Sequence, residues 1–263
     1  MASEPQSNLP LFYNDLMPLN SRDHAKWHSR PIDAVTWVRG HHAVPLTVEE
    51  FPQAQRDFPI IFSSGAEAVP LALMGLNEGV NTFIDDDGKA IGEFYLPAYI
   101  RRYPFMLARL TPEAQEMSLC FDPTCDAIGE FEEGEPLFDG EGKPTEALQN
   151  ALAFCDQFEQ SGLRTHAFIE EISKHDLLMD GEIAITRADQ PEKPYVYRGF
   201  RMVDEAKLRG LDKDVVAEWN ANGIMALLYA HLFSMDMMRV IFARQVEQGK
   251  VPEQTAQAVD SPA

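Results

Sequence analysis

The spacing of apolar residues changes near position 145, and this change constrains the fold more than any other feature of the sequence. Upstream, short apolar runs are separated by turn residues, which is typical of strands. The expected strands lie at 34–38, 43–48, 58–63, 69–75, 80–84, 117–121 and 128–131, with a short helix at 49–56. Downstream, Leu148, Leu152, Cys155 and Phe158 recur at the spacing of a helix.

The second part of the chain is predicted to be mostly helical. Gly162 is a typical helix stop, Asp204 and Asp212 are good N-caps, and Gly223 interrupts the apolar pattern. The expected helices are 145–162, 166–178, 204–210, 212–219 and 224–245, and the expected strands are 181–186 and 195–203. We therefore expect an α+β fold with a mainly antiparallel sheet and helices concentrated in the C-terminal half.

Length and composition indicate a single folded domain. The chain has 263 residues, and 45% of them are hydrophobic, which is enough to build a sizeable core. Both ends are polar and rich in Pro, Gln, Ala or Ser. We expect a flexible arm at 1–10, one domain over 11–248 and a flexible tail at 249–263.

The chain is strongly acidic, and its charge is unevenly distributed. Forty-two acidic residues against 22 basic ones give a net charge of −20. Nucleic-acid affinity depends on cationic side chains that release counterions, so we expect no nucleic-acid partner. Residues 113–146 hold eleven acids and one Lys. This segment is either a solvated face or a docking surface for a basic or cationic partner protein.

The sequence predicts a reduced, cytoplasmic protein. Cys120, Cys125 and Cys155 lack zinc-site spacing, so we expect free thiols, with a bridge between Cys120 and Cys125 as the alternative. The first sixteen residues lack the basic and apolar regions of a secretory signal peptide. The longest apolar run, 224–233, is too short to cross a bilayer, so we expect no membrane insertion.

The most unusual local feature is 94–110, where two prolines enclose paired arginines and several tyrosines. The prolines favour a strand, a short turn and a second strand. In one interpretation the aromatic rings are core and the arginines extend to solvent along their apolar stems. In the other, one arginine binds a carboxylate or phosphate with its planar guanidinium. The candidate binding residues here are Tyr95, Tyr99, Arg101, Arg102 and Tyr103.

Motifs of the common enzyme classes are missing from the sequence. It has no G-x-S-x-G, no glycine-rich phosphate loop, no H-E-x-x-H and no C-x-x-C, and we expect no cofactor. His24 and His28 are four residues apart, so a helix would bring them to one face as weak metal-ligand candidates. His231 lies on an apolar stripe, which favours a buried histidine bonded to a carbonyl or to Ser234 over a catalytic base.

Four blocks of the sequence resemble the SapC-like family of bacterial proteins. They are MPLNSRDHAKWHSR (17–30), FYLPAYIRRYPF (94–105), YRGFRMVDEAKLRGL (197–211) and GIMALLYAHLFSMDMM (223–238). Arg198 in the third block and His231 in the fourth join the candidate binding residues. The resemblance implies a surface-layer or envelope association, since such proteins tend to be encoded near halogenase-like flavoproteins and outer-membrane transport receptors. It implies no catalytic residues.

Two functions from different classes are compatible with these patterns. We expect a non-catalytic binding or accessory protein of a bacterial envelope, surface-layer or nutrient-uptake system, whose ligand is a small molecule or peptide. The alternative is an enzyme acting on a peptide or amino-acid-like substrate, in which Arg101 or Arg102 holds a carboxylate and a histidine transfers protons. The two differ in geometry, because the enzyme needs those arginines and His24, His28 or His231 in one pocket.

Overall fold

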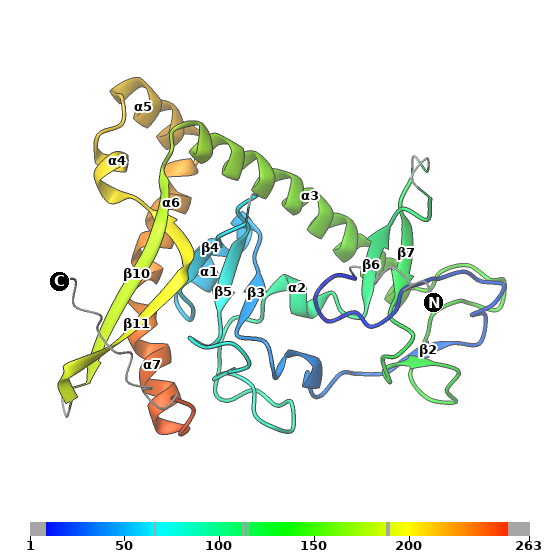
Figure 1. Cartoon of the computed structure of the whole chain (residues 1–263). Helices are drawn as coiled ribbons and strands as arrows, with labels where there is room; N and C mark the ends of the chain where they lie inside the picture. The colour runs from blue at the N-terminus through cyan, green and yellow to red at the C-terminus, as the bar shows by residue number, and fades with distance from the viewer. Residues whose placement is uncertain (1–8, 66, 112–113, 115, 188–189, 252–263) are drawn as a thin grey trace, which may run out of the picture.

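The computed structural model describes residues 9–65, 67–111, 114, 116–187 and 190–251. These residues form two hydrophobic cores of unequal size, a large one on a five-stranded sheet and a small one around Phe121 and Leu137. A long helix, α3 (Glu146–Lys174), runs from the small core to the large one, as Figure 1 shows. Its first turn buries Leu148 in the small core, and its last turns bury Phe168 and Ile172 in the large one.

The large core packs on an antiparallel sheet with the strand order β10-β11-β4-β5-β3. Its strands are β3 (Ala43–Pro45), β4 (Ile60–Ser63), β5 (Pro70–Leu73), β10 (Leu178–Arg187) and β11 (Gln190–Val203). β10 and β11 form a long hairpin, and β11 pairs with β4, where Phe200 lies opposite Ser63 and Arg201 opposite Phe62. The sheet therefore joins both halves of the chain, and the predicted α+β class is confirmed.

In the part of the chain that the structure describes, four helices follow the hairpin: α4 (Glu205–Arg209), α5 (Lys213–Asn222), α6 (Ile224–Ser234) and α7 (Met237–Glu247). Asp204 and Asp212 cap α4 and α5 as predicted, because their carboxylates accept first-turn N–H groups. Gly223 ends α5 with a φ of 88°, a conformation that glycine adopts without steric cost. The predicted helix over 224–245 is divided, since Met235 and Asp236 separate α6 from α7.

By length and composition, one stretch among the described residues, Ile224–Glu247, could cross a bilayer. This is weak evidence, because core helices of water-soluble proteins meet the same criteria. One face of the stretch is buried through Leu228 and Ile241, whereas Tyr229 and Phe233 are exposed and their rings stack at 6.0 Å.

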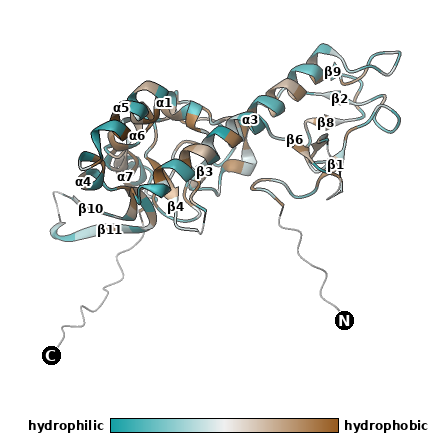
Figure 2. Ribbon diagram, turned by 90° about the horizontal axis from the view of Figure 1, so that it is seen from above, coloured by the Kyte–Doolittle hydropathy of each residue, from teal (hydrophilic) through white to brown (hydrophobic). Residues whose placement is uncertain are grey.

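The small core is built by two three-stranded sheets, with the orders β1-β7-β6 and β8-β2-β9. Their strands are β1 (Met17–Pro18), β2 (His28–Ser29), β6 (Phe105–Ala108), β7 (Ser118–Phe121), β8 (Ile128–Gly129) and β9 (Glu135–Pro136). Figure 2 shows these strands gathered around one end of α3, away from the hairpin. The acidic segment 113–146 thus contributes strands to this core as well as exposed carboxylates.

The continuity of α3 corrects the prediction of two helices. The helix begins where the sequence predicts, and the Thr145 hydroxyl caps its first turn by accepting from the Leu148 N–H, but Gly162 does not end the helix. No proline follows it in α3, and Phe168 and Ile172 continue the buried stripe. Packing against the large core therefore outweighs the roughly 1 kcal/mol cost of a glycine inside a helix.

Other predicted elements also differ from the structure. The strand expected at 34–38 is a 3₁₀ turn, η1 (Thr36–Val38), and 80–84 contributes only one bridge, between Ile84 and Ala90. The helix expected at 49–56 is present as η2 (Val48–Glu50) and α1 (Phe51–Ala54). The stretch 94–110 forms a short helix, α2 (Ala98–Arg101), before β6, because Pro97 precedes the first turn, where a missing N–H costs little.

The predicted arm and tail lie largely outside the described residues. Three residues of the expected tail, 249–251, are described and contact the body of the protein. The Lys250 Nζ donates to the Asn81 carbonyl at 2.8 Å, and Val251 packs against the large core. The folded body therefore extends at least three residues beyond the predicted boundary.

Candidate functional site

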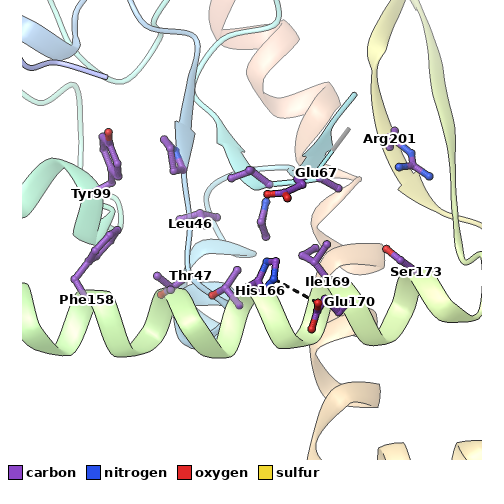
Figure 3. Close-up of a pocket in the computed structure, with 16 residues that line it drawn as sticks. Leu46, Thr47, Glu67, Tyr99, Phe158, His166, Ile169, Glu170, Ser173 and Arg201 are labelled. Carbon is purple, nitrogen blue, oxygen red and sulfur yellow. Dashed lines mark ion pairs between the residues drawn. The ribbon is translucent and has the colours of Figure 1, made fainter. Parts of the chain in front are cut away.

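A groove with a volume of about 460 Å³ lies between α3 and the ends of β3 and β5. Figure 3 shows Tyr99 and Phe158 at one end of it, His166 near the middle, and Ser173 and Arg201 at the other end. The residues that α3 contributes to the lining include Phe158, Gly162, Thr165, Ile169 and Ser173. This spacing of three to four residues means that one helix face forms the wall, which is roughly 22 Å long at 1.5 Å per residue.

The first end of the groove is aromatic. Tyr99 comes from α2, and its ring centroid lies 6.0 Å from that of Phe158 in an edge-to-face arrangement. The Tyr99 hydroxyl donates to the Leu11 carbonyl at 3.2 Å, and burial raises its pKa. The phenol therefore stays protonated at neutral pH, and this end of the groove presents uncharged aromatic surface to a ligand.

A buried carboxylate fixes the loop after β3 to the start of α2. Glu50 accepts from the Thr47 N–H at 2.8 Å and from the Thr47 hydroxyl at 3.0 Å. Its second oxygen accepts from the Ala98 N–H at 2.6 Å and the Tyr95 hydroxyl at 3.0 Å. Because Ala98 immediately precedes Tyr99 in α2, these bonds also position the aromatic end of the groove.

The floor of the groove contains a threonine whose hydroxyl is already bonded to the protein. Thr165 in α3 accepts from the Val48 N–H at 3.0 Å and donates to the Ser161 carbonyl at 2.7 Å. Leu46 and Ile169, which are buried, line the same part of the groove. The floor of the groove therefore offers a mainly apolar surface, which is typical of sites that bind the body of a small molecule, whereas Glu67 and His166 add polar groups to the middle of the lining.

The second end of the groove is polar. In α3, the His166 Nε2 lies 3.5 Å from a carboxylate oxygen of Glu170. Arg201 extends from β11, and its Nη2 donates to the Leu178 carbonyl at 3.3 Å, which is the only hydrogen bond of this side chain within the described residues. A guanidinium carries five N–H donors in a planar fork, so most of them remain available to a ligand carboxylate.

Arg101 and Arg102 lie outside this groove and differ in their surroundings. Arg102 is buried behind its aromatic end, with its guanidinium carbon 4.4 Å from the Tyr99 ring centroid and 4.3 Å from that of Phe158. Arg101 is exposed, and its Nε donates to the Leu96 carbonyl at 3.0 Å. The two neighbours thus face different environments, and the buried one stacks on aromatic rings instead of extending to solvent.

The remaining tyrosines and Arg198 are also separated from one another. Tyr95 lines an adjacent pocket of about 350 Å³ together with Arg101. The Tyr103 hydroxyl donates to the Asp122 carboxylate at 3.3 Å, at the boundary with the small core. Arg198 is exposed on β11 and pairs with Glu182 at 2.6 Å. Of the predicted binding residues, Tyr99 alone is part of the groove lining.

His231 has the structural role that the sequence favours. Its Nδ1 lies 2.7 Å from the Ile60 carbonyl, and its Nε2 accepts from the Val203 N–H at 3.1 Å. The imidazole therefore joins α6 to β4 and β11 as a neutral ring. Burial lowers its pKa to about 4, which keeps it uncharged at neutral pH.

The prediction that His24 and His28 share a helical face is wrong. Turns and a bend occupy 21–26, and His28 belongs to β2. The His24 ring is buried against Trp27, with the ring centroids 4.7 Å apart. Within the described residues, no group of three His, Cys, Asp or Glu side chains could hold a metal ion. Arg101 lines two pockets, the second together with Arg102, and His24, His28 and His231 are not among the described residues that line either one.

Sequence reasoning missed His166, Ser173 and Arg201 as residues of one site. A signal for the α3 residues exists, because 158, 162, 165, 169 and 173 fall on one helical face once Gly162 is read as part of the helix. Arg201 has no such signal. It reaches the groove because β11 pairs with β4, a contact between residues far apart in the sequence.

Comparison with known proteins identifies a family and nothing more specific. The model of the family described as SapC matches residues 19–241, a span that includes α3, the whole described groove lining, the small core and most of the large core. No match was found among curated proteins or among solved structures. The match covers most of the chain, and the chain therefore belongs to the SapC family.

Proposed function

We propose that this chain is a non-catalytic binding or accessory protein of a bacterial envelope, surface-layer or nutrient-uptake system. In this proposal the groove along α3 holds a short peptide or an elongated small molecule that ends in a carboxylate. The observation that carries the proposal is the difference between the two ends of the groove. One end is aromatic, at Tyr99 and Phe158, and the other has the guanidinium of Arg201.

The dimensions and chemistry of the groove support a ligand of this class. A volume of about 460 Å³ lies within the range of roughly 300–1,000 Å³ that is usual for small-molecule sites. A wall of roughly 22 Å accommodates about six residues of extended peptide at 3.3–3.6 Å per residue. The apolar floor at Leu46 and Ile169 would contact the body of the ligand, and the free donors of Arg201 would bind its terminal carboxylate.

Substitutions in the groove test the proposal directly. A Cβ at Gly162 meets nothing within 4 Å, so Gly162→Leu places a side chain in the groove without a backbone clash. The matched control is Ala167→Leu, at an exposed position of α3 outside the lining. The probes are di- to hexapeptides with a free C-terminus, measured by calorimetry. We expect Gly162→Leu to weaken binding at least about tenfold and Ala167→Leu to leave it unchanged.

The carboxylate contact has its own matched pair on β11. Loss of a charge-assisted hydrogen bond costs about 1.5–3 kcal/mol, so Arg201→Gln should raise the Kd about tenfold or more. Arg198→Gln removes an exposed arginine three residues away and should leave the Kd unchanged. Amidation of the peptide C-terminus should have the effect of Arg201→Gln. Equal binding of free and amidated peptides would contradict the proposed contact.

The envelope or uptake role and the partner surface are further parts of the proposal. They rest on family membership and on the exposed Glu130, Glu132 and Glu133 of the acidic segment, which suit a basic partner protein. The cytoplasmic location stays a prediction. Fractionation of the native host tests the location. Crosslinking at low and high salt tests the partner surface, because an electrostatic contact weakens as salt increases.

An enzyme remains the second candidate, and one observation favours it. His166 and Glu170 form an imidazole–carboxylate pair in the same groove as Arg201, an arrangement that general base catalysis uses. Chromatography of the peptide probes after incubation separates the two functions. The binding protein returns every peptide intact, whereas an enzyme forms products and loses this activity in His166→Gln.

A further inference from the structure

A second cavity, of about 260 Å³, lies where α2, the N-terminal part of α3 and the small core meet. Its described lining contains three arginines, Arg30, Arg101 and Arg102, and no Asp or Glu among the described residues. In a chain whose acidic residues outnumber its basic ones 42 to 22, this local excess of positive charge is unusual. Like charges that converge on one cavity repel each other, and a bound anion removes that cost.

Arg102 forms the buried part of this cavity. Its side chain is 6% exposed, and its Nε is a buried donor with no hydrogen-bond partner in the described part of the chain. Its Nη1 has one carboxylate contact, to Glu159 at 3.4 Å, which is longer than a usual charge-assisted bond. Burial also raises the pKa of the Glu159 carboxyl against the influence of Arg102. Glu159 is therefore a weak counter-ion, and Arg102 retains unused donor capacity.

The other two arginines are exposed, which places them on the solvent side, at the opening of the cavity, and Arg101 also lines the adjacent pocket of about 350 Å³. The Arg101 Nη2 donates to the Tyr95 hydroxyl at 3.2 Å, and its Nε to the Leu96 carbonyl at 3.0 Å. The Arg30 guanidinium lies 3.6 Å from the Phe131 ring centroid. Neither arginine has a carboxylate within ion-pair distance among the described residues. Both are thus oriented by neutral groups and keep their charge available.

The rest of the lining determines the kind of anion. The walls are mainly apolar, formed by Ile32, Phe105, Ala127, Ile128, Ala151 and Phe154. Inorganic anions gain nothing from such walls, whereas a hydrocarbon group removes apolar surface from water there. The volume is below that of a typical drug-sized site, which limits the ligand to a small molecule.

We infer that this three-arginine cavity is a binding site for a small organic carboxylate with an apolar body. The carboxylate accepts hydrogen bonds from Arg102 inside the cavity and from Arg30 and Arg101 at its opening. The hydrocarbon part lies against Phe105 and Phe154. This site is separate from the α3 groove, and the two share no lining residue.

Calorimetric titration with hexanoate, hexanamide and inorganic phosphate tests the inference. Hexanamide has the shape of hexanoate without its charge, and phosphate has charge without an apolar body. We expect hexanoate to bind with a stoichiometry of one and the other two to bind at least about tenfold more weakly. Absence of hexanoate binding overturns the inference, as does equal binding of hexanamide. Tighter binding of phosphate overturns the apolar part of the assignment.

Variants at the opening locate the bound anion without disturbing the buried Arg102. Arg30→Gln and Arg101→Gln, both at exposed positions, should each raise the Kd of hexanoate about tenfold. Arg198→Gln controls for the loss of one positive charge, and Arg201→Gln controls for binding in the α3 groove. Both controls should bind hexanoate as the unmodified protein does, because hexanoate is too short to span the roughly 22 Å between the aromatic end of the α3 groove and Arg201. If Arg201→Gln weakens binding and Arg30→Gln does not, hexanoate occupies the groove and the inference fails.

Discussion

Glu50 is a buried residue whose bonding partners come from two segments of the chain. Its carboxylate accepts from the Thr47 N–H and hydroxyl and from two groups at the start of α2. The sequence places Glu50 three residues after Thr47, which is the spacing of a capping box, and the structure has that box. The link to Ala98 and Tyr95, by contrast, is a tertiary contact that no local pattern encodes.

Replacing this carboxylate by an amide should destabilise the protein. In Glu50→Gln the amide NH₂ must face a donor, either at Thr47 or at α2, and one buried donor then loses its partner. We expect the free energy of unfolding to fall by about 2–4 kcal/mol. The adjacent Glu49→Gln is the control, because Glu49 is exposed and its ion pair with Arg164 should contribute less than about 1 kcal/mol. Urea denaturation measures both, and equal effects would contradict the argument.

His231 makes the stability dependent on pH. Its pKa is about 4 in the folded protein and about 6.5 when unfolded, so the unfolded chain binds the proton more readily between these values. Its contribution to stability is therefore complete above pH 6.5 and is lost as the pH falls toward 4. The loss amounts to about 3 kcal/mol.

Comparison of variants isolates this contribution from the titration of carboxylates. Urea denaturation at several pH values between 7 and 4 gives, for each protein, the slope of the free energy of unfolding against pH. The slope should be smaller in His231→Gln than in the unmodified protein, whereas His166→Gln, at an exposed position, should keep the full slope. If His231→Gln and the unmodified protein have the same slope, His231 does not act as described.

At the scale of elements, two glycines show which sequence signals are reliable. Gly223 separates α5 from α6 as predicted, and its φ of 88° requires a residue that tolerates the left-handed region. Gly162 is equally prominent in the sequence but lies inside α3, where its φ is not in the positive region and a Cβ would meet no atom within 4 Å. A glycine therefore ends a helix only where the chain must change direction, and tertiary packing decides at which glycine this happens.

Alanine at these two glycines should have opposite effects on stability. Gly162→Ala reduces the conformational freedom of the unfolded chain without a clash, so the free energy of unfolding should rise by about 0.5–1 kcal/mol. Gly223→Ala places a residue with a side chain in the left-handed region, so the free energy of unfolding should fall by about 1 kcal/mol. Thermal denaturation measures both changes. The same sign for both would mean that the backbone at one of them differs from this description.

Most helices and about half of the short strands follow from local patterns, because caps and apolar periods are short-range signals. The candidate sites do not. The α3 groove needs Arg201 from β11 beside a helix face that begins at Phe158, and the three-arginine cavity needs Arg30 beside Arg102. These pairs meet only after the sheets form, so their sequence spacing carries no information about the distance between them.

The whole molecule carries a net charge of −20. Three of the eleven acids of the acidic segment, Glu130, Glu132 and Glu133, are exposed and form no ion pair among the described residues. Self-repulsion of this kind destabilises the compact state and is screened by salt.

Thermal stability at pH 7 should therefore rise as sodium chloride increases from near zero to about 0.15 M, where the screening length shortens to about 8 Å. The triple variant Glu130→Gln, Glu132→Gln and Glu133→Gln removes three of the repelling charges, so its melting temperature at low salt should be higher and its response to salt smaller.

The control is a second triple variant, Glu141→Gln, Glu182→Gln and Glu205→Gln, which removes the same number of charges at carboxylates that form ion pairs. These carboxylates each have a cationic partner, so their removal should relieve less repulsion and leave a larger salt response. A melting temperature independent of salt in the unmodified protein would show that the acidic surface is already balanced by bound cations.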